Sequence, residues 1–266
     1  MPRLAAFPAL LLSAVAAPAL AMPPMASFDN FKVIFENPGV QNSTAVFDVK
    51  GVETFEGRAL GMNSGGFTTD FGTGGVIQAT YTGGRIDNAN VYGSAGGVGR
   101  HIVTFSNFAS PNNVIDISFT TTLPQGLNYF GYWLSALDAG NRLEFLSGAT
   151  SLGVITPASV IGALGGCPSA SNPYCGNPTG PFLGRVPHEQ FAFLNVYFDP
   201  GVTYDRVRIF QVGGGGYESD NHTVGSFLRT NIVPEPATWM MLITGFGLVG
   251  FALRRRAPRG LATVSA

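Results

Sequence analysis

The chain has 266 residues, a formal net charge of −1 and only 12% charged residues. Five of its 15 basic residues, Arg3, Arg254, Arg255, Arg256 and Arg259, lie near the two ends, so the central region is acidic on balance. An acidic region without a basic stripe excludes a binder of nucleic acid or of anionic lipid surfaces. Its abundant Gly, Asn, Thr, Ser, Phe and Tyr favour strands joined by turns.

The first segment has the pattern of a secretory signal peptide. Arg3 precedes an apolar run over residues 4–17, and a small-x-small site follows at Ala19 and Ala21. We therefore expect residues 1–21 to be removed, leaving Met22 as the new N-terminus. The alternative, a retained N-terminal anchor, is disfavoured because the apolar run is short and contains a proline.

Residues 22–232 alternate short apolar runs with turn signals, and no run of ten or more residues combines helical periodicity with caps. Strands are expected at 31–36, 44–49, 54–60, 76–82, 101–105, 115–119, 129–136, 142–146, 151–155, 191–198, 204–210 and 222–228. Short turns at 37–39, 138–141 and 199–201 are expected to join their flanking strands as pairs. The pattern predicts an all-β, antiparallel, jelly-roll-like β-sandwich.

Cys167 and Cys175 are the only two cysteines, and they lie in a segment rich in Pro, Gly, Ser and Asn. Two thiols so close in an exported protein predict a disulfide that closes this loop. A metal site would need further ligands nearby, and a redox pair is more often Cys-x-x-Cys. We therefore predict a structural role for this disulfide.

Chemical motifs in the body are sparse. His101, His188 and His222 are far apart in sequence and are interpreted as polar surface or loop residues. A glycosidase needs two carboxylates about 5 to 10 Å apart. Glu144, Glu189, Glu218 and Asp220 could supply them in many combinations. We therefore expect no enzyme, with a glycan-active hydrolase as the alternative.

Two weaker binding sites are considered. Asp220 and Asn221 precede the last predicted strand and are the candidates for a calcium ion, although a turn-forming role is the favoured interpretation. Tyr174 and Tyr217 lie in predicted loops, where exposed rings could stack on sugars, whereas Trp133 lies in a strand apolar on both faces and is expected in the core. No other cofactor is expected.

The C-terminal region has three consecutive parts. Val233, Pro234, Glu235 and Pro236 form a segment whose prolines hold the backbone extended. Residues 237–253 carry no charge and would form a helix about 25 Å long, enough for a short transmembrane span. Arg254, Arg255 and Arg256 then stop transfer on the cytoplasmic side, ahead of a short tail at 257–266.

This order, with Gly245, Gly247 and Gly250 in the apolar run, resembles the PEP-CTERM sorting signal of bacteria that make exopolysaccharide. The resemblance covers residues 233–256. It implies that a membrane-embedded exosortase recognises Pro234-Glu235-Pro236 and cleaves there. The protein would lie in the inner membrane transiently and then reach the cell surface or extracellular matrix.

Parts of the body also resemble jelly-roll modules of PEP-CTERM proteins and carbohydrate-binding domains. They are the runs 129–138, 141–145 and 217–221. The resemblance implies a structural or glycan-binding role, possible contact with exopolysaccharide, and exosortase as partner. The alternatives are the hydrolase and an envelope protein that stays anchored without processing.

Overall fold

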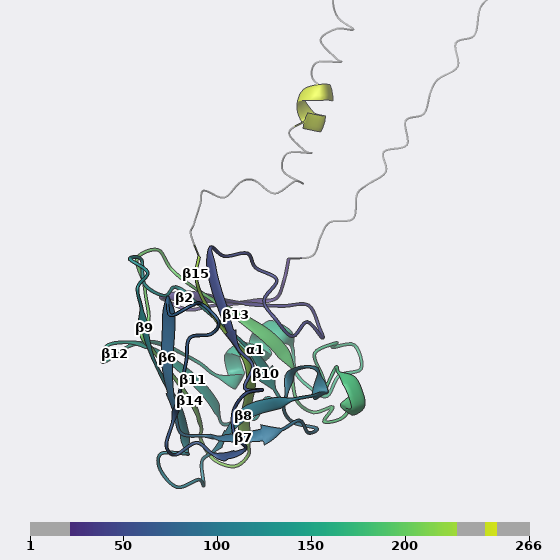
Figure 1. The fold of residues 1–266 in the computed structure, drawn as a ribbon. Helices are drawn as coiled ribbons and strands as arrows, with labels where there is room; N and C mark the ends of the chain where they lie inside the picture. The colour runs from purple at the N-terminus through teal and green to yellow at the C-terminus, as the bar shows by residue number, and fades with distance from the viewer. Residues whose placement is uncertain (1–21, 228–242, 249–266) are drawn as a thin grey trace, which may run out of the picture. The chain divides into compact units, whose positions relative to one another are not determined.

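The computed structural model describes residues 22–227 and 243–248. The body is a sandwich of two antiparallel β-sheets (Figure 1), which confirms the predicted fold class. Residues 243–248 belong to a second structural unit and are helical. Within the described ranges, no helix combines the length and the apolar character needed to cross a bilayer. The predicted signal peptide, including Ala19 and Ala21, lies outside the described residues.

The larger sheet has nine strands. Its order is β1 (Met25–Ser27), β2 (Phe31–Phe35), β13 (Ala192–Phe198), β10 (Tyr129–Ser135), β15 (Gly216–Ser226), β8 (Arg100–Phe105), β7 (Arg85–Asn88) and β4 (Gly61–Met62), and β3 (Val49–Glu53) also pairs with β15. β10 and β15 are neighbours near the middle of this sheet.

The smaller sheet has six strands. Its order is β12 (Thr150–Ile155), β11 (Asn141–Ser147), β14 (Arg206–Gln211), β9 (Val114–Thr121), β6 (Ile77–Thr82) and β5 (Phe67–Thr69). The helical elements of the body are short: η1 (Ala95–Gly97), α1 (Pro157–Leu164) and η2 (Gly180–Phe182). α1 begins with a capping box between Thr156 and Ser159, a signal that sequence analysis missed in so short a helix.

An aromatic core fills the space between the sheets. Phe130 of β10 lies within ring-contact distance of Phe145, on β11 of the facing sheet, with centroids 5.8 Å apart. Phe145 in turn contacts Phe198 edge to face, at 5.0 Å. The predicted alternation of Ile115, Ile117 and Phe119 is confirmed, because all three are buried. Such burial is the main source of the sandwich's stability.

The hairpins predicted at the turns 37–39, 138–141 and 199–201 are wrong, although most of the predicted strands exist. β10 and β11 belong to different sheets, and so do β13 and β14. The turns at 138–141 and 199–201 therefore carry the chain across the sandwich, as in a jelly-roll-like arrangement. Residues 44–48 and 54–60 form no strand, and β2 pairs with β1 and β13 instead.

The predicted disulfide is confirmed. Cys167 and Cys175 are bonded, with Cα atoms 5.6 Å apart. The loop is also held by a backbone bond from Phe191 N–H to the Tyr174 carbonyl, 3.0 Å long. The bridge therefore fixes a loop that already has a second attachment to the sheet.

Replacing both cysteines with serine is expected to lower the free energy of unfolding by less than about 3 kcal/mol, because the closed loop is short. Urea unfolding followed by circular dichroism checks this. The double variant should keep the β-sheet spectrum of the oxidised protein. Loss of that spectrum would show that the bridge supports the whole sandwich instead of one loop.

Candidate functional site

A groove of about 460 Å³ lies on the outer face of the smaller sheet. Its floor follows from strand alternation: in β6, Ile77, Ala79 and Tyr81 turn inward and are buried, so Gln78 and Thr80 face solvent. The lining residues are Arg58, Thr68, Thr69, Asp70, Gln78, Ala79, Thr80, Ser118 and Thr120. Most of them carry a neutral hydroxyl or amide.

Strand register sets these hydroxyls side by side. Thr80 on β6 is opposite Thr68 on β5 and Ser118 on β9. Gln78 is opposite Thr120 in the next row. Directly opposed residues have Cβ atoms about 5 Å apart, so the groove presents a grid of short polar groups.

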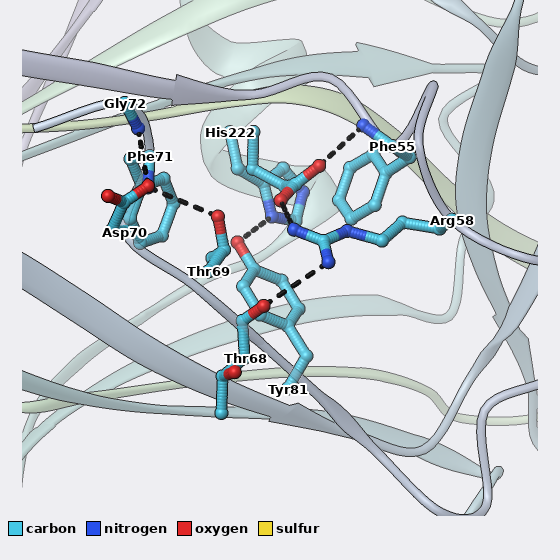
Figure 2. A network of polar contacts seen from close by, with 10 residues as sticks. Phe55, Arg58, Thr68, Thr69, Asp70, Phe71, Gly72, Tyr81 and His222 are labelled. Carbon is cyan, nitrogen blue, oxygen red and sulfur yellow. Dashed lines mark hydrogen bonds and ion pairs between the residues drawn. The ribbon is translucent and has the colours of Figure 1, made fainter. Parts of the chain in front are cut away.

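Arg58 forms one wall of the groove (Figure 2), and its position is fixed by three contacts. Its Nη1 donates to the Thr68 carbonyl at 3.2 Å, and its Nη2 pairs with the carboxylate of Glu53. Its guanidinium lies 4.2 Å from the centre of the Phe67 ring. Glu53 also accepts a bond from Phe55 N–H at 2.8 Å. The arginine is therefore preorganised rather than free to swing.

Behind this wall, a polar chain enters the core. The Tyr81 hydroxyl lies 3.1 Å from Nδ1 of His222 (Figure 2). Nε2 of His222 lies 2.9 Å from Oγ of Ser219. Burial lowers the pKa of His222 to about 3, so its imidazole is neutral. The prediction of a surface or loop histidine is wrong here, and also for His101, which is fully buried.

Asp70 closes the other end of the groove. Its Oδ1 accepts from Gly72 N–H at 3.0 Å, which fixes a turn after β5 (Figure 2). Asp70 is the one carboxylate among the described lining residues, so the groove holds no pair of acids for glycosidase chemistry. Its chemistry is that of hydrogen bonding to a polar ligand.

The predicted sorting residues Val233, Pro234, Glu235, Pro236, Arg254, Arg255 and Arg256 lie outside the described residues. Residues 233–256 match the family model of the PEP-CTERM protein-sorting motif. The chain carries a PEP-CTERM motif. This motif is a signal that exosortase recognises, and it implies an exported protein that is anchored in the membrane transiently before cleavage.

Beyond the PEP-CTERM motif, similarity to known proteins is low. No curated protein matches the chain. A similar solved structure is the K2 cleaved adhesin domain of Lys-gingipain, with 16% sequence identity and a TM-score of 0.38. The likeness covers 67% of this chain and 100% of that domain.

The predicted stacking residues of this PEP-CTERM protein are buried. Tyr174 is 7% exposed and Tyr217 is 2% exposed. The Tyr217 hydroxyl bonds that of Tyr132 at 2.8 Å, and the Tyr174 hydroxyl donates to the Glu36 carbonyl at 3.0 Å. Neither ring offers a face to a sugar, so this prediction is wrong. Tyr217 is not in a loop, because β15 begins at Gly216, earlier than the strand predicted at 222–228.

The calcium candidates are engaged elsewhere. The two carboxylate oxygens of Asp220 accept bonds from Ala95 N–H at 2.8 Å and Asn221 N–H at 2.7 Å. The Asn221 amide donates to the Gln41 carbonyl at 3.0 Å. In the described part of the chain, no three His, Cys, Asp or Glu side chains form a group that could hold a metal. The arrangement does not fit calcium.

The four acids considered for hydrolysis divide between the sheets. Glu144 is on β11, 3.9 Å from Nη1 of Arg208. Glu218 and Asp220 are both on β15, two residues apart and buried, and Glu189 precedes β13. Glu189 adds to the rise in the pKa of Glu218, after burial and Asp138. This second group of acids is not in the groove.

Proposed function

We propose that this exported protein is a surface or exopolysaccharide-matrix protein whose β-sandwich binds glycan in the groove beside Arg58. The observation that supports it is the grid of exposed hydroxyl and amide groups on Thr68, Thr80, Ser118, Thr120 and Gln78. Sugar hydroxyls donate and accept hydrogen bonds, and so do these side chains. A neutral, preorganised grid of this kind suits a polysaccharide.

Binding at one groove is expected to be weak. The groove has no exposed aromatic platform among its lining residues, so hydrogen bonds and the Arg58 wall supply its affinity. Each net hydrogen bond contributes about 0.5–1.5 kcal/mol. A polysaccharide with many repeats offsets this weak affinity by multivalency, because many copies of the exported protein contact one polysaccharide molecule. This would retain the protein in a matrix while leaving single contacts reversible.

Valine at both Thr80 and Thr120 is expected to weaken retention on polysaccharide about tenfold, because two hydrogen-bonding hydroxyls are lost while shape is kept. The full chain in detergent micelles is applied to dextran, alginate and the producing bacterium's exopolysaccharide. Thr150→Val is the matched control, since Thr150 is exposed on β12 at the opposite edge of the same sheet. Equal retention of all three proteins would contradict the proposal.

The same assay separates binding from the alternative of hydrolysis. A binding protein retains the polymer and releases no new reducing ends. Steady release of sugar fragments would identify a hydrolase and would direct attention to the acids of β15. The remaining alternative, an unprocessed membrane-anchored envelope protein, is tested at the C-terminus, as described in the Discussion.

A further inference from the structure

A second set of polar groups lies on the outer face of the larger sheet. Tyr132 and Leu134 of β10 belong to the core between the sheets, so Trp133 and Ser135 point to the opposite side. Both are only 1% exposed. The outer face of this sheet is therefore covered, unlike the outer face that carries the groove.

Strand register extends this set across the sheet. Trp133 is opposite Asp220 of β15, and Ser135 is opposite Glu218. On β8, Ile102 faces the core, so the neighbouring His101 lies on the covered face. Two adjacent rows thus carry an indole, a hydroxyl, an imidazole and two carboxyl groups.

Two loops form the cover. From the loop 89–99, Ala95 N–H donates to Asp220 at 2.8 Å, and Ser94 Oγ lies 2.9 Å from Nδ1 of His101. From the loop 176–190, the Asn177 amide donates to the Val91 carbonyl at 3.2 Å, which ties the two loops together. Val186 packs on the aromatic cluster that contains Trp133, Phe191 and Phe193.

Several polar atoms under this cover have no partner. They are Nε1 of Trp133, Oγ of Ser135, Nε2 of His101 and Oε2 of Glu189. A buried polar group without a hydrogen bond costs about 1–3 kcal/mol, so native proteins rarely leave several together. Their gathering on one face calls for a ligand that both donates and accepts hydrogen bonds.

The charge of Glu218 and Asp220 decides whether this face suits a charged or a neutral ligand. Burial, with the nearby Asp138 and Glu189, raises the pKa of Glu218 to about 8. Burial also raises the pKa of Asp220 to about 8, although two backbone N–H groups oppose this shift. Near neutral pH both carboxyls are largely protonated, so the face is polar but close to uncharged.

We propose that the covered face of the larger sheet is a second binding site, which takes a neutral, hydroxyl-rich small ligand such as a single sugar unit. The rings of Trp133, Phe191 and Phe193 are covered in the closed protein, so the ligand binds only when the loops 89–99 and 176–190 move apart. The uncovered rings would then pack against the apolar face of the sugar ring, and Ser135 and Glu218 would bond its hydroxyls. This site is independent of the proposed groove.

Trp133 reports on this site directly. The chain has two tryptophans, and Trp239→Phe leaves Trp133 alone. The full chain with this substitution, in detergent micelles, is titrated with D-glucose, D-galactose, D-mannose, N-acetyl-D-glucosamine and D-glucuronate. We expect a saturable change in Trp133 emission with at least one neutral sugar, and a weaker response to glucuronate.

Ser135→Ala should weaken that saturable response at least fivefold and should not destabilise the free protein, because Oγ of Ser135 has no partner to lose. Thr150→Val is the control and should titrate like the parent. No saturable change with any sugar, a response unaffected by Ser135→Ala, or binding of glucuronate alone would overturn the proposal. Polymer retention by the groove is measured separately, so either proposal can fail without the other.

Discussion

Alanine at Pro234, Glu235 and Pro236 is expected to leave the protein unprocessed and to lower its surface pool at least tenfold. Prolines disfavour a helix at this position, and the glutamate is the one charge directly on the N-terminal side of the apolar run. A protease at the membrane can read such a segment, whereas alanines would favour extension of the predicted apolar helix through it. Fractionation with immunoblotting should show a larger, membrane-bound form.

Pro258→Ala is the matched control for this experiment. It removes a proline just beyond the arginines, outside residues 233–256. The control should be processed and delivered like the parent chain. Normal delivery of the triple-alanine variant would mean that Pro-Glu-Pro is not what the sorting machinery reads.

The body is expected to lose stability as the pH rises from about 6.5 to 8. Burial raises the pKa of both Glu218 and Asp220 to about 8 and that of Glu189 to about 7. A raised pKa means that the folded state holds the proton more tightly than the unfolded state. The resulting stability is complete at low pH and is lost as the pH rises through the folded pKa.

The expected loss over this window is about 2–3 kcal/mol, because one pKa unit corresponds to about 1.4 kcal/mol per group. His101 and His222 act oppositely, since burial lowers their pKa to about 4 and about 3. The stabilisation that the histidines add as the pH rises is largely complete above their unfolded pKa of about 6.5. The acids therefore dominate the change in the free energy of unfolding between about pH 6.5 and 8. Urea unfolding at pH 6.5 and pH 8 measures the difference.

Glu218→Gln is the informative variant for this prediction. The amide copies the protonated acid but cannot ionise, so the fall in stability between pH 6.5 and 8 should shrink by about one group's share. Asp199→Asn serves as control, because Asp199 lies in the turn after β13, outside the group of buried acids. Stability that is unchanged or higher at pH 8 in the parent chain would contradict the account.

Strands were predictable from local patterns, but their partners were not. β9 was found because Ile115, Ile117 and Phe119 alternate with polar residues. Pairing depends on which sheet each strand joins, and short turns at 138–141 and 199–201 look alike in a hairpin and in a crossover between sheets. Alternation fixes a strand's faces but carries no information about its neighbour.

Local sequence patterns also determine which sites could be predicted. The terminal sorting signal is contiguous, so its order alone identified it. The groove joins Arg58, Thr68, Thr80 and Thr120 from four separate segments, and an exposed threonine on a strand is unremarkable in sequence. Glu218 was considered only as one of four acids, because the last strand was predicted to begin at 222, whereas β15 begins at Gly216. The covering loops that bury it are distant in sequence and could not be foreseen.

The whole account depends on a chain that is exported, cut near its C-terminus and released as a β-sandwich. Intact-mass spectrometry of the protein recovered from the cell surface or matrix tests this directly. The account predicts an N-terminus at Met22 and a C-terminus within or next to residues 233–236. A recovered chain that still extends through Arg256 would contradict it.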